Sequence, residues 1–252
     1  MSWPKRVAAY DPRSGKELWT CSGLNPLVYT SPLYSDGMVV AMGGVMGMAL
    51  AVKAGGSGDV TGTHRVWHHP KTKQRIGSGV IYEGHVYIVN DPGVAECYEL
   101  KTGKLIWEER LVGQGPDNSS WSSMVLADGR LYAINHSGDT FVLKASPKFE
   151  VLAANSVGEP DNASLAVSEG DLFIRTHKAL GASPSLEDLE RSDGKLSAKL
   201  FRLRPAHLRH HALELAHFFH HLLHLVKTVE QCVQLRDTHA AAFGDALPPA
   251  RI

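Results

Sequence analysis

Short alternations of apolar and polar residues, separated by glycine turns, fill most of the chain before residue 177. Each unit begins with a cluster of small residues, continues as a brief apolar alternation, turns at a Gly and returns as a second alternation. A period of two predicts β-strands, and an acidic residue followed by Gly between two such runs predicts a hairpin turn. The turn glycines are Gly37, Gly84, Gly129 and Gly170.

These units recur about every 45 residues, a repeat length that is typical of propeller blades built from short strands. The strands are rich in Val, Ile, Leu and Tyr, and their alternation is imperfect, which suits sheets that neighbouring blades cover on both faces. The predicted fold is all-β: a partial β-propeller of about four 4-stranded antiparallel blades.

A second marker follows each hairpin. An acidic residue precedes a Gly and a Lys, and a Trp ends the pattern; the two best copies are Asp11, Gly15 and Trp19, and Glu99, Gly103 and Trp107. We expect the carboxylate to accept turn N–H groups, the Gly to be left-handed and the Trp to pack on the next blade. Trp67 belongs to a degraded copy, and Phe149 or Val151 is expected in place of Trp in another.

The pattern Ala-x-Asp-x-x-x-Gly-Lys-Glu-x-Trp at residues 9–19 resembles the tryptophan-docking motif of the pyrroloquinoline-quinone (PQQ) type β-propeller repeat family. The resemblance covers about residues 5–177. It implies a bacterial protein, and it is specific for fold rather than activity, because the family includes quinoprotein dehydrogenases and a propeller lipoprotein of the outer-membrane barrel-assembly machinery. Dehydrogenases of the family have about eight blades, so four copies indicate a truncated member.

By the same resemblance, a dehydrogenase would need a calcium site of Glu, Asn and Asp, and often a disulfide between adjacent cysteines. Cys21, Cys97 and Cys232 are far apart, and no acidic cluster can be placed at a channel mouth. We therefore expect no PQQ and no catalytic residue, and we identify no cofactor-binding residues. The favoured function is a non-catalytic scaffold that binds a protein or ligand. The alternative is a fragment of a PQQ-dependent dehydrogenase, an oxidoreductase.

Other polar clusters have simple interpretations. His64, His68 and His69 lack a Cys or carboxylate that would complete a tetrahedral metal site, so we interpret them as solvated surface. The small residues Ser122 and Ser123 fit the crowded start of an inner strand, and no His–acid pair supports a nucleophile. Candidates to face a central channel are Lys53, Arg75 and Arg175.

The strand pattern stops after residue 177. We assign residues 1–177 to the repeats and residues 178–252 to a His- and Leu-rich tail, helical or disordered, whose composition also fits a frame-shifted product. Apolar residues at helical spacing favour a helix there. Its i,i+4 histidine pairs are candidate transition-metal ligands: His217 with His221, and His220 with His224.

The charge balance limits the partners. Formal net charge is +0, so we expect neither nucleic acid nor an anionic membrane as partner. No apolar stretch has the length of a membrane span, and the first residues lack a signal peptide core, although the family is often periplasmic or envelope-associated. The compartment stays open. An incomplete ring would expose blade faces, so we expect a protein partner or self-association.

Overall fold

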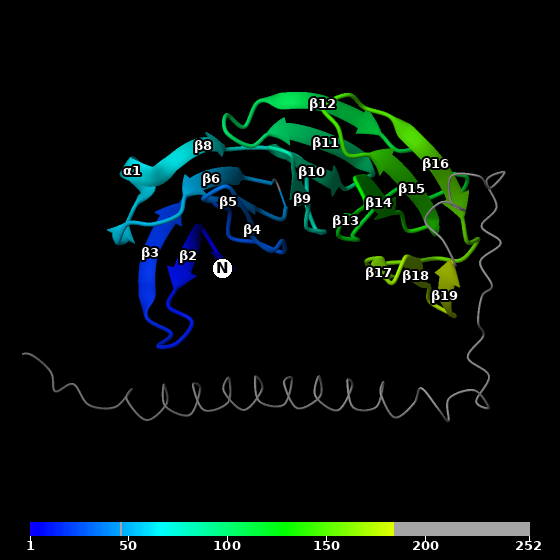
Figure 1. Cartoon of the computed structure of the whole chain (residues 1–252), viewed down its shortest axis with the longest axis horizontal. Helices are drawn as coiled ribbons and strands as arrows, with labels where there is room; N and C mark the ends of the chain where they lie inside the picture. The colour runs from blue at the N-terminus through cyan, green and yellow to red at the C-terminus, as the bar shows by residue number, and fades with distance from the viewer. Residues whose placement is uncertain (46, 184–252) are drawn as a thin grey trace, which may run out of the picture. The chain divides into compact units, whose positions relative to one another are not determined.

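The computed structural model describes residues 1–45 and 47–183, so the tail candidates His217, His220, His221 and His224 lie outside it. The described residues belong to one compact unit, Met1–Arg202. They form five small β-sheets whose first strands follow one another along the chain, together with one short helix (Figure 1). Four sheets have four strands and the last has three, so the predicted all-β architecture of four-stranded sheets is confirmed, with five sheets instead of about four and with one parallel strand pair in the first sheet.

The sheets are numbered one to five in chain order. Sheet one contains β1 (Ser2–Trp3), β2 (Arg6–Tyr10), β3 (Glu17–Ser22) and β7 (Gly58–Asp59). Sheet two contains β4 (Leu33–Ser35), β5 (Met38–Met42), β6 (Ala49–Lys53) and β8 (Arg65–His69). Sheet three contains β9 (Val80–Tyr82), β10 (His85–Asn90), β11 (Val94–Glu99) and β12 (Leu105–Arg110). Sheet four contains β13 (Val125–Ala127), β14 (Arg130–Ile134), β15 (Asp139–Lys144) and β16 (Val151–Ser156).

Sheet five contains β17 (Ala166–Ser168), β18 (Asp171–Arg175) and β19 (Leu180–Ser183), and the helix is α1 (Thr61–His64). Strand β19 lies beyond residue 177, where the pattern of the sequence predicts no further strand. It pairs antiparallel with β18, from Leu172 opposite Ser183 to Arg175 opposite Leu180.

The hairpin between the first two strands of sheets two to five turns at an acidic residue and a Gly. Both residues have positive φ in every copy; the pairs are Asp36 and Gly37, Glu83 and Gly84, Asp128 and Gly129, and Glu169 and Gly170. Two consecutive positive φ values define a type I′ turn, whose twist matches that of the paired strands. The acidic residue at the first position carries the strain of a Cβ at positive φ, and Gly at the second position avoids it.

A β-bulge lies next to the Trp of the outer strand in sheets one to three. The pairing of the last two strands shifts just beyond Ala9 opposite Trp19, and the same shift follows Ala51 opposite Trp67. In sheet four the shift follows Val142 opposite Ala153. Ala153 therefore occupies the Trp position, and the expectation of Phe149 or Val151 there is wrong, because the turn between β15 and β16 has a different length.

Each Trp contacts the sheet that follows it. Trp19 is buried against Ala41, Leu50 and Val52 of sheet two. The indole N–H of Trp67 donates to the carbonyl oxygen of Leu100 at 2.8 Å.

Trp107 contacts sheet four in the same way. Its indole N–H donates to the carbonyl oxygen of Ser146 at 3.2 Å, and its ring lies 5.0 Å from that of Phe149. A Cβ on Gly103 would press into the ring of Trp67, so this Gly provides space as well as its left-handed φ of 70°.

Four serines join consecutive sheets at the start of the first strands. The backbone N–H of Ser31 donates to Oγ of Ser78 at 2.9 Å, that of Ser78 to Oγ of Ser123 at 3.0 Å, and that of Ser123 to Oγ of Ser164 at 2.9 Å. The partners lie 47, 45 and 41 residues apart, which is the repeat period itself. We call these four residues the junction serines.

The surroundings of the junction serines are crowded, as predicted. A Cβ on Gly77 would collide with the carbonyl oxygen of Ser122, and one on Gly79 with that of Tyr87. The hydroxyl of Ser122 also donates, at 2.8 Å, to the carbonyl oxygen of Ala163 in the connection that enters the next sheet. Small side chains at these positions let the backbones of neighbouring first strands approach closely.

Replacement of Trp107 by Ala tests the junction between sheets three and four. Trp107 is 9% exposed, and loss of a buried Trp side chain is expected to lower the free energy of unfolding by about 3–5 kcal/mol. Urea denaturation measures this loss. Trp3→Ala, at a side chain 38% exposed, is the control and should cost less than about 1 kcal/mol. Equal losses of stability in the two variants would contradict a stabilising role of Trp107 at the junction between sheets three and four.

Candidate functional site

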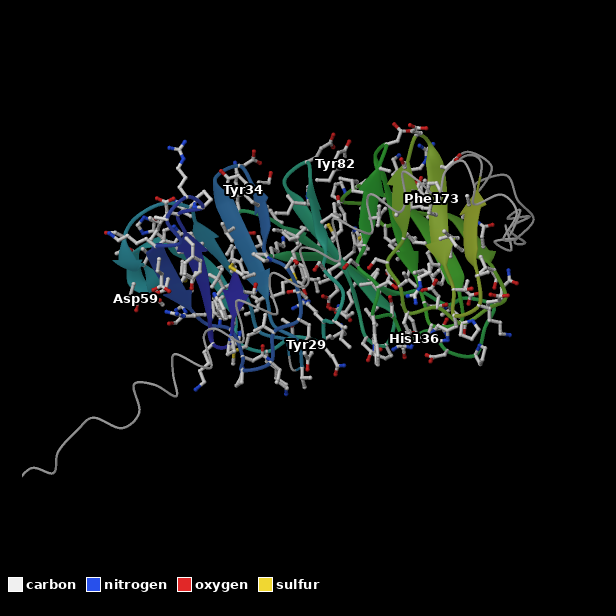
Figure 2. The ribbon with its side chains drawn as sticks, turned by 90° about the horizontal axis from the view of Figure 1, so that it is seen from below. Tyr29, Tyr34, Asp59, Tyr82, His136 and Phe173 are labelled. Atoms are coloured by element: carbon white, nitrogen blue, oxygen red, sulfur yellow. The ribbon has the colours of Figure 1, made fainter. Side chains whose placement is uncertain are left out.

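The two ends of the sheets differ in what they display. One end, the turn face, carries the acidic–Gly turns. The other, the loop face, consists of the connections before β4, β9, β13 and β17 and the loops after β5, β10, β14 and β18. Figure 2 shows the division: Tyr34 and Tyr82 lie toward one edge of the ribbon, and Tyr29 and His136 toward the opposite edge.

One backbone hydrogen bond recurs on the loop face of each of sheets two to five. The loop N–H groups of Gly44, Asp91, His136 and His177 donate to the carbonyl oxygens of Leu27, Gln74, Ser119 and Pro160, respectively. Each acceptor lies in the connection that enters the same sheet. A repeated backbone scaffold of this kind leaves the side chains free to differ between repeats.

Apolar side chains project from this scaffold. On the loop face Leu27 and Tyr29 are each 51% exposed, Val112 66% and Trp121 47%. Tyr29 and Trp121 occupy the same position of the repeat, two residues before a junction serine. The turn face carries a carboxylate in each turn, beside the exposed Tyr34. The four exposed apolar side chains make the loop face the better candidate for contact with another protein.

A cleft of about 660 Å³ opens on the loop face where sheets four and five meet. It is lined by Gln114, Gly115, Pro116, Asp117, His136, Ser137, Ser156, Gly158, Pro160, Asn162 and His177. Its volume falls within the range of small-molecule and side-chain binding pockets. His136 and His177 are equivalent residues of consecutive repeats, since both N–H groups bind the connection of their own sheet.

His136 is held in place by its neighbours in the cleft. Its Nδ1 lies 3.4 Å from a carboxylate oxygen of Asp117, and the ring of Trp121 meets it edge-on at 4.9 Å. Its Nε2 is buried and has no hydrogen-bond partner among the described residues. The carboxylate of Asp117 favours the proton on Nδ1, so Nε2 of the neutral ring is an acceptor.

Asp161 lies between two lining residues, Pro160 and Asn162, and is 1% exposed. Its backbone N–H donates to the carbonyl oxygen of His136 at 3.1 Å, and one carboxylate oxygen accepts the N–H of Ala163. Within the described part of the chain, the other oxygen has no hydrogen-bond partner. Burial raises the pKa of Asp161, and the Ala163 hydrogen bond and nearby positive charges oppose that rise only in part.

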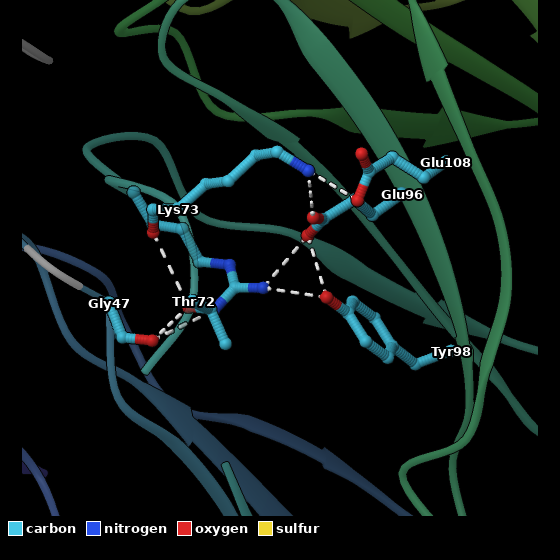
Figure 3. A network of polar contacts seen from close by, with 7 residues as sticks. Gly47, Thr72, Lys73, Glu96, Tyr98 and Glu108 are labelled. Atoms are coloured by element: carbon cyan, nitrogen blue, oxygen red, sulfur yellow. Dashed lines mark hydrogen bonds and ion pairs between the residues drawn. The ribbon is translucent and has the colours of Figure 1, made fainter. Parts of the chain in front are cut away.

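A buried ion pair joins sheets two and three (Figure 3). Arg75, in the connection before β9, is 0% exposed, and its guanidinium donates to Glu96 at 2.8 Å and to the hydroxyl of Tyr98 at 3.1 Å. It also donates to the carbonyl oxygen of Gly47 in the loop of sheet two. Arg75 therefore does not face a channel, contrary to the expectation, whereas Lys53 and Arg175 are exposed.

The ion pair controls the ionisation of Glu96. Burial alone would raise the pKa of Glu96, but the charge of Arg75 and hydrogen bonds from Arg75 and Tyr98 outweigh it, so the pKa lies below its usual value. Lys73 extends the network, since its ammonium group contacts both Glu96 and Glu108. Because every charge faces an opposite charge, the network is a structural clamp between two sheets.

The sequence-predicted residues fall at several separate places. Asp11 and Glu99 lie in turns: Asp11 accepts the N–H of Arg13 at 2.7 Å, and Glu99 accepts the hydroxyl of Thr102. Gly15 has a φ of 70°, like Gly103. None of these residues, and none of the turn glycines, lines the cleft among the residues described. The cleft residues carried no sequence motif that could have identified them.

The histidines beside Trp67 are less solvated than predicted. His68 contacts the carbonyl oxygen of Gly23 at 2.9 Å, and His69 lies half-buried between the rings of Trp67 and Tyr98. Burial lowers the pKa of His69. Over residues 1–45 and 47–183, no group of three or more His, Cys, Asp or Glu side chains could hold a metal ion. No helix in that same part is long and apolar enough to cross a membrane.

Sheets two to five share one order of strands, one turn type and the same serine contacts, which is typical of a β-propeller repeat protein. A family model described as outer membrane protein assembly factor BamB matches residues 2–199, so the chain belongs to this family of PQQ-type propeller repeats. The match passes residue 177, and Glu190, Gly194 and Lys195 repeat the spacing of Glu99, Gly103 and Lys104. No curated protein matches the chain.

Solved structures with the same fold are distant in sequence. BamB from Moraxella catarrhalis has 15% identity and a TM-score of 0.53, over 72% of this chain and 55% of that one. A europium-containing methanol dehydrogenase has 10% identity and a TM-score of 0.54, over 78% and 49%. A chain of the mitotic checkpoint complex has 10% identity and a TM-score of 0.54, over 72% and 59%. The chain thus spans about half the length of these neighbours.

Removal of Arg75 tests the buried clamp. Arg75→Met leaves the Glu96 carboxylate with only the partly exposed Lys73 as a cationic partner, and we expect a loss of about 3 kcal/mol at pH 7 by urea denaturation, the lower end of the range for a broken buried pair. The double variant Arg75→Met with Glu96→Gln removes the buried negative charge and should regain more than half of this loss. A double variant no more stable than the single one would show that charge is not the cause.

The same variant has a predicted pH dependence. In the wild type the depressed pKa of Glu96 contributes stability above the unfolded-state pKa, and this contribution is lost as the pH falls. In Arg75→Met the positive charge that lowers the pKa of Glu96 is gone, while burial still raises that pKa. Glu96 therefore binds a proton at higher pH. The deficit of Arg75→Met relative to wild type should therefore shrink between pH 7 and pH 5. A constant deficit over this range would contradict the prediction.

Proposed function

We propose that this chain is a non-catalytic propeller-repeat scaffold whose loop face binds a protein partner. The observation that carries the proposal is the set of exposed apolar side chains on that face, Leu27, Tyr29, Val112 and Trp121. Such side chains are costly to display to water unless a partner covers them, and aromatic residues are enriched among those that dominate binding energy.

The family supports this choice, because its description names an assembly factor. We propose that the chain plays a comparable part, holding one protein component of an assembly. A neighbour from the mitotic checkpoint complex is consistent with propellers as protein-binding modules, although it shares only the fold.

Photo-crosslinking tests which face binds. A photoreactive amino acid at position 29 or 121 of the full chain should give a discrete crosslinked species in the cells that produce it. The matched control is position 34, because Tyr34 is more exposed, at 68%, but lies at the opposite edge. Crosslinks from position 34 with none from 29 or 121 would show that the partner binds the turn face and not the loop face.

The alternative, a fragment of a quinoprotein dehydrogenase, is tested by adding PQQ, calcium and an alcohol to the full chain and following dye reduction. We expect no turnover above that of the mixture without protein. Saturable turnover would replace the scaffold proposal by the oxidoreductase.

A further inference from the structure

The cleft between sheets four and five has a specific chemical character. Its described lining offers carboxylate, imidazole, amide and carbonyl groups, and it contains neither Lys nor Arg. The carboxylate of Asp117 is 53% exposed, and Asp161 follows the lining residue Pro160. The described lining is therefore rich in hydrogen-bond acceptors and carries one exposed carboxylate, that of Asp117.

Several of these acceptors lack a partner within residues 1–45 and 47–183. They are Nε2 of His136, Oδ2 of Asp161 and Oδ1 of Asp139, all buried. Asp139 lies just under the cleft, since its other oxygen accepts the N–H of the lining residue Gly115 at 2.9 Å. Buried polar atoms without partners are uncommon, and a cluster of them beside a cleft indicates that a hydrogen-bond donor is to be bound there.

We infer that the cleft binds a basic side chain, preferably arginine, of the polypeptide that contacts the loop face. This inference rests on the proposed function, because Trp121 belongs both to the exposed apolar set and to the contacts of His136. A guanidinium group presents N–H donors in a plane, packs on aromatic rings and pairs with carboxylates, which matches this wall.

Two other ligand classes fit less well. A metal ion would need three or more converging His, Cys, Asp or Glu ligands, and the described residues contain no such group. An anion would meet the carboxylate of Asp117 with no Lys or Arg in the described lining to offset the repulsion. The volume of about 660 Å³ also suits a side chain with part of its backbone better than a single ion.

A matched pair of small probes tests the inference on the full chain. Acetyl-arginine amide carries the guanidinium, whereas acetyl-citrulline amide has nearly the same shape without the charge. Titration followed by the NMR signal of the Trp121 indole N–H should show a saturable shift with the arginine probe. The citrulline probe should bind at least about tenfold more weakly, because charge-assisted hydrogen bonds are lost.

Variants locate the binding. Asp117→Asn should weaken the arginine probe about tenfold, and Asp161→Asn should also weaken it. Asp128→Asn is the control, because its side chain is 80% exposed on the turn face and should have no effect. Equal binding of both probes, no saturable shift, or wild-type affinity in Asp117→Asn would each overturn the inference.

The result is separable from the proposed function. Crosslinks from positions 29 and 121 without binding of the arginine probe would keep the protein-binding face and reject the arginine site. Binding of the probe without those crosslinks would keep the site and reject the partner face.

Discussion

The contact on which the fold depends is the hydrogen bond from one junction serine to the next. It links the start of one first strand to the start of the following one, at separations of 47, 45 and 41 residues. Each serine can donate its backbone N–H to the next repeat and accept an N–H from the previous repeat with its hydroxyl oxygen. One serine in each repeat therefore supplies both groups that the junctions need. Sheets joined in this way interact mainly with their neighbours, as in other repeat proteins.

The outer strands impose a second constraint on the same junctions. A β-bulge places each Trp toward the next sheet, and the indole N–H of Trp67 and of Trp107 reaches a backbone carbonyl there. Inner serines and outer tryptophans thus fix both edges of the junctions between sheets two and three and between sheets three and four. The buried pair of Arg75 and Glu96 adds a clamp between sheets two and three, where a connection passes between them.

The repeat was predictable from the sequence because its markers are local. The turn glycines and the Trp spacing follow from backbone conformation and strand register, which a few neighbouring residues determine. The end of the pattern was harder to see: Ala198 stands eight positions after Glu190, where the better copies have Trp, although the family match continues to residue 199. The burial of Arg75 was missed because its partners, Glu96 and Tyr98, are distant in sequence.

The cleft was not predictable for a related reason. His136, Asp117 and Asp161 come from three different loops and match no motif, so only the tertiary structure brings them together. The repeated backbone bonds of the loop face hold these loops whatever side chains they carry. The functional side chains thus lie at loop positions that differ between repeats, whereas the backbone that carries them is the same in each repeat. This explains why the sequence identifies the fold better than the activity.

Amide hydrogen exchange measured by NMR tests the junction serines most directly. The account predicts that the backbone N–H groups of Ser31, Ser78 and Ser123 exchange slowly, although Ser31 itself is exposed, and that Ser78→Ala selectively speeds exchange at Ser31. Exchange at these three amides as fast as at the exposed turn residue Glu169, or no response of Ser31 to Ser78→Ala, would contradict it.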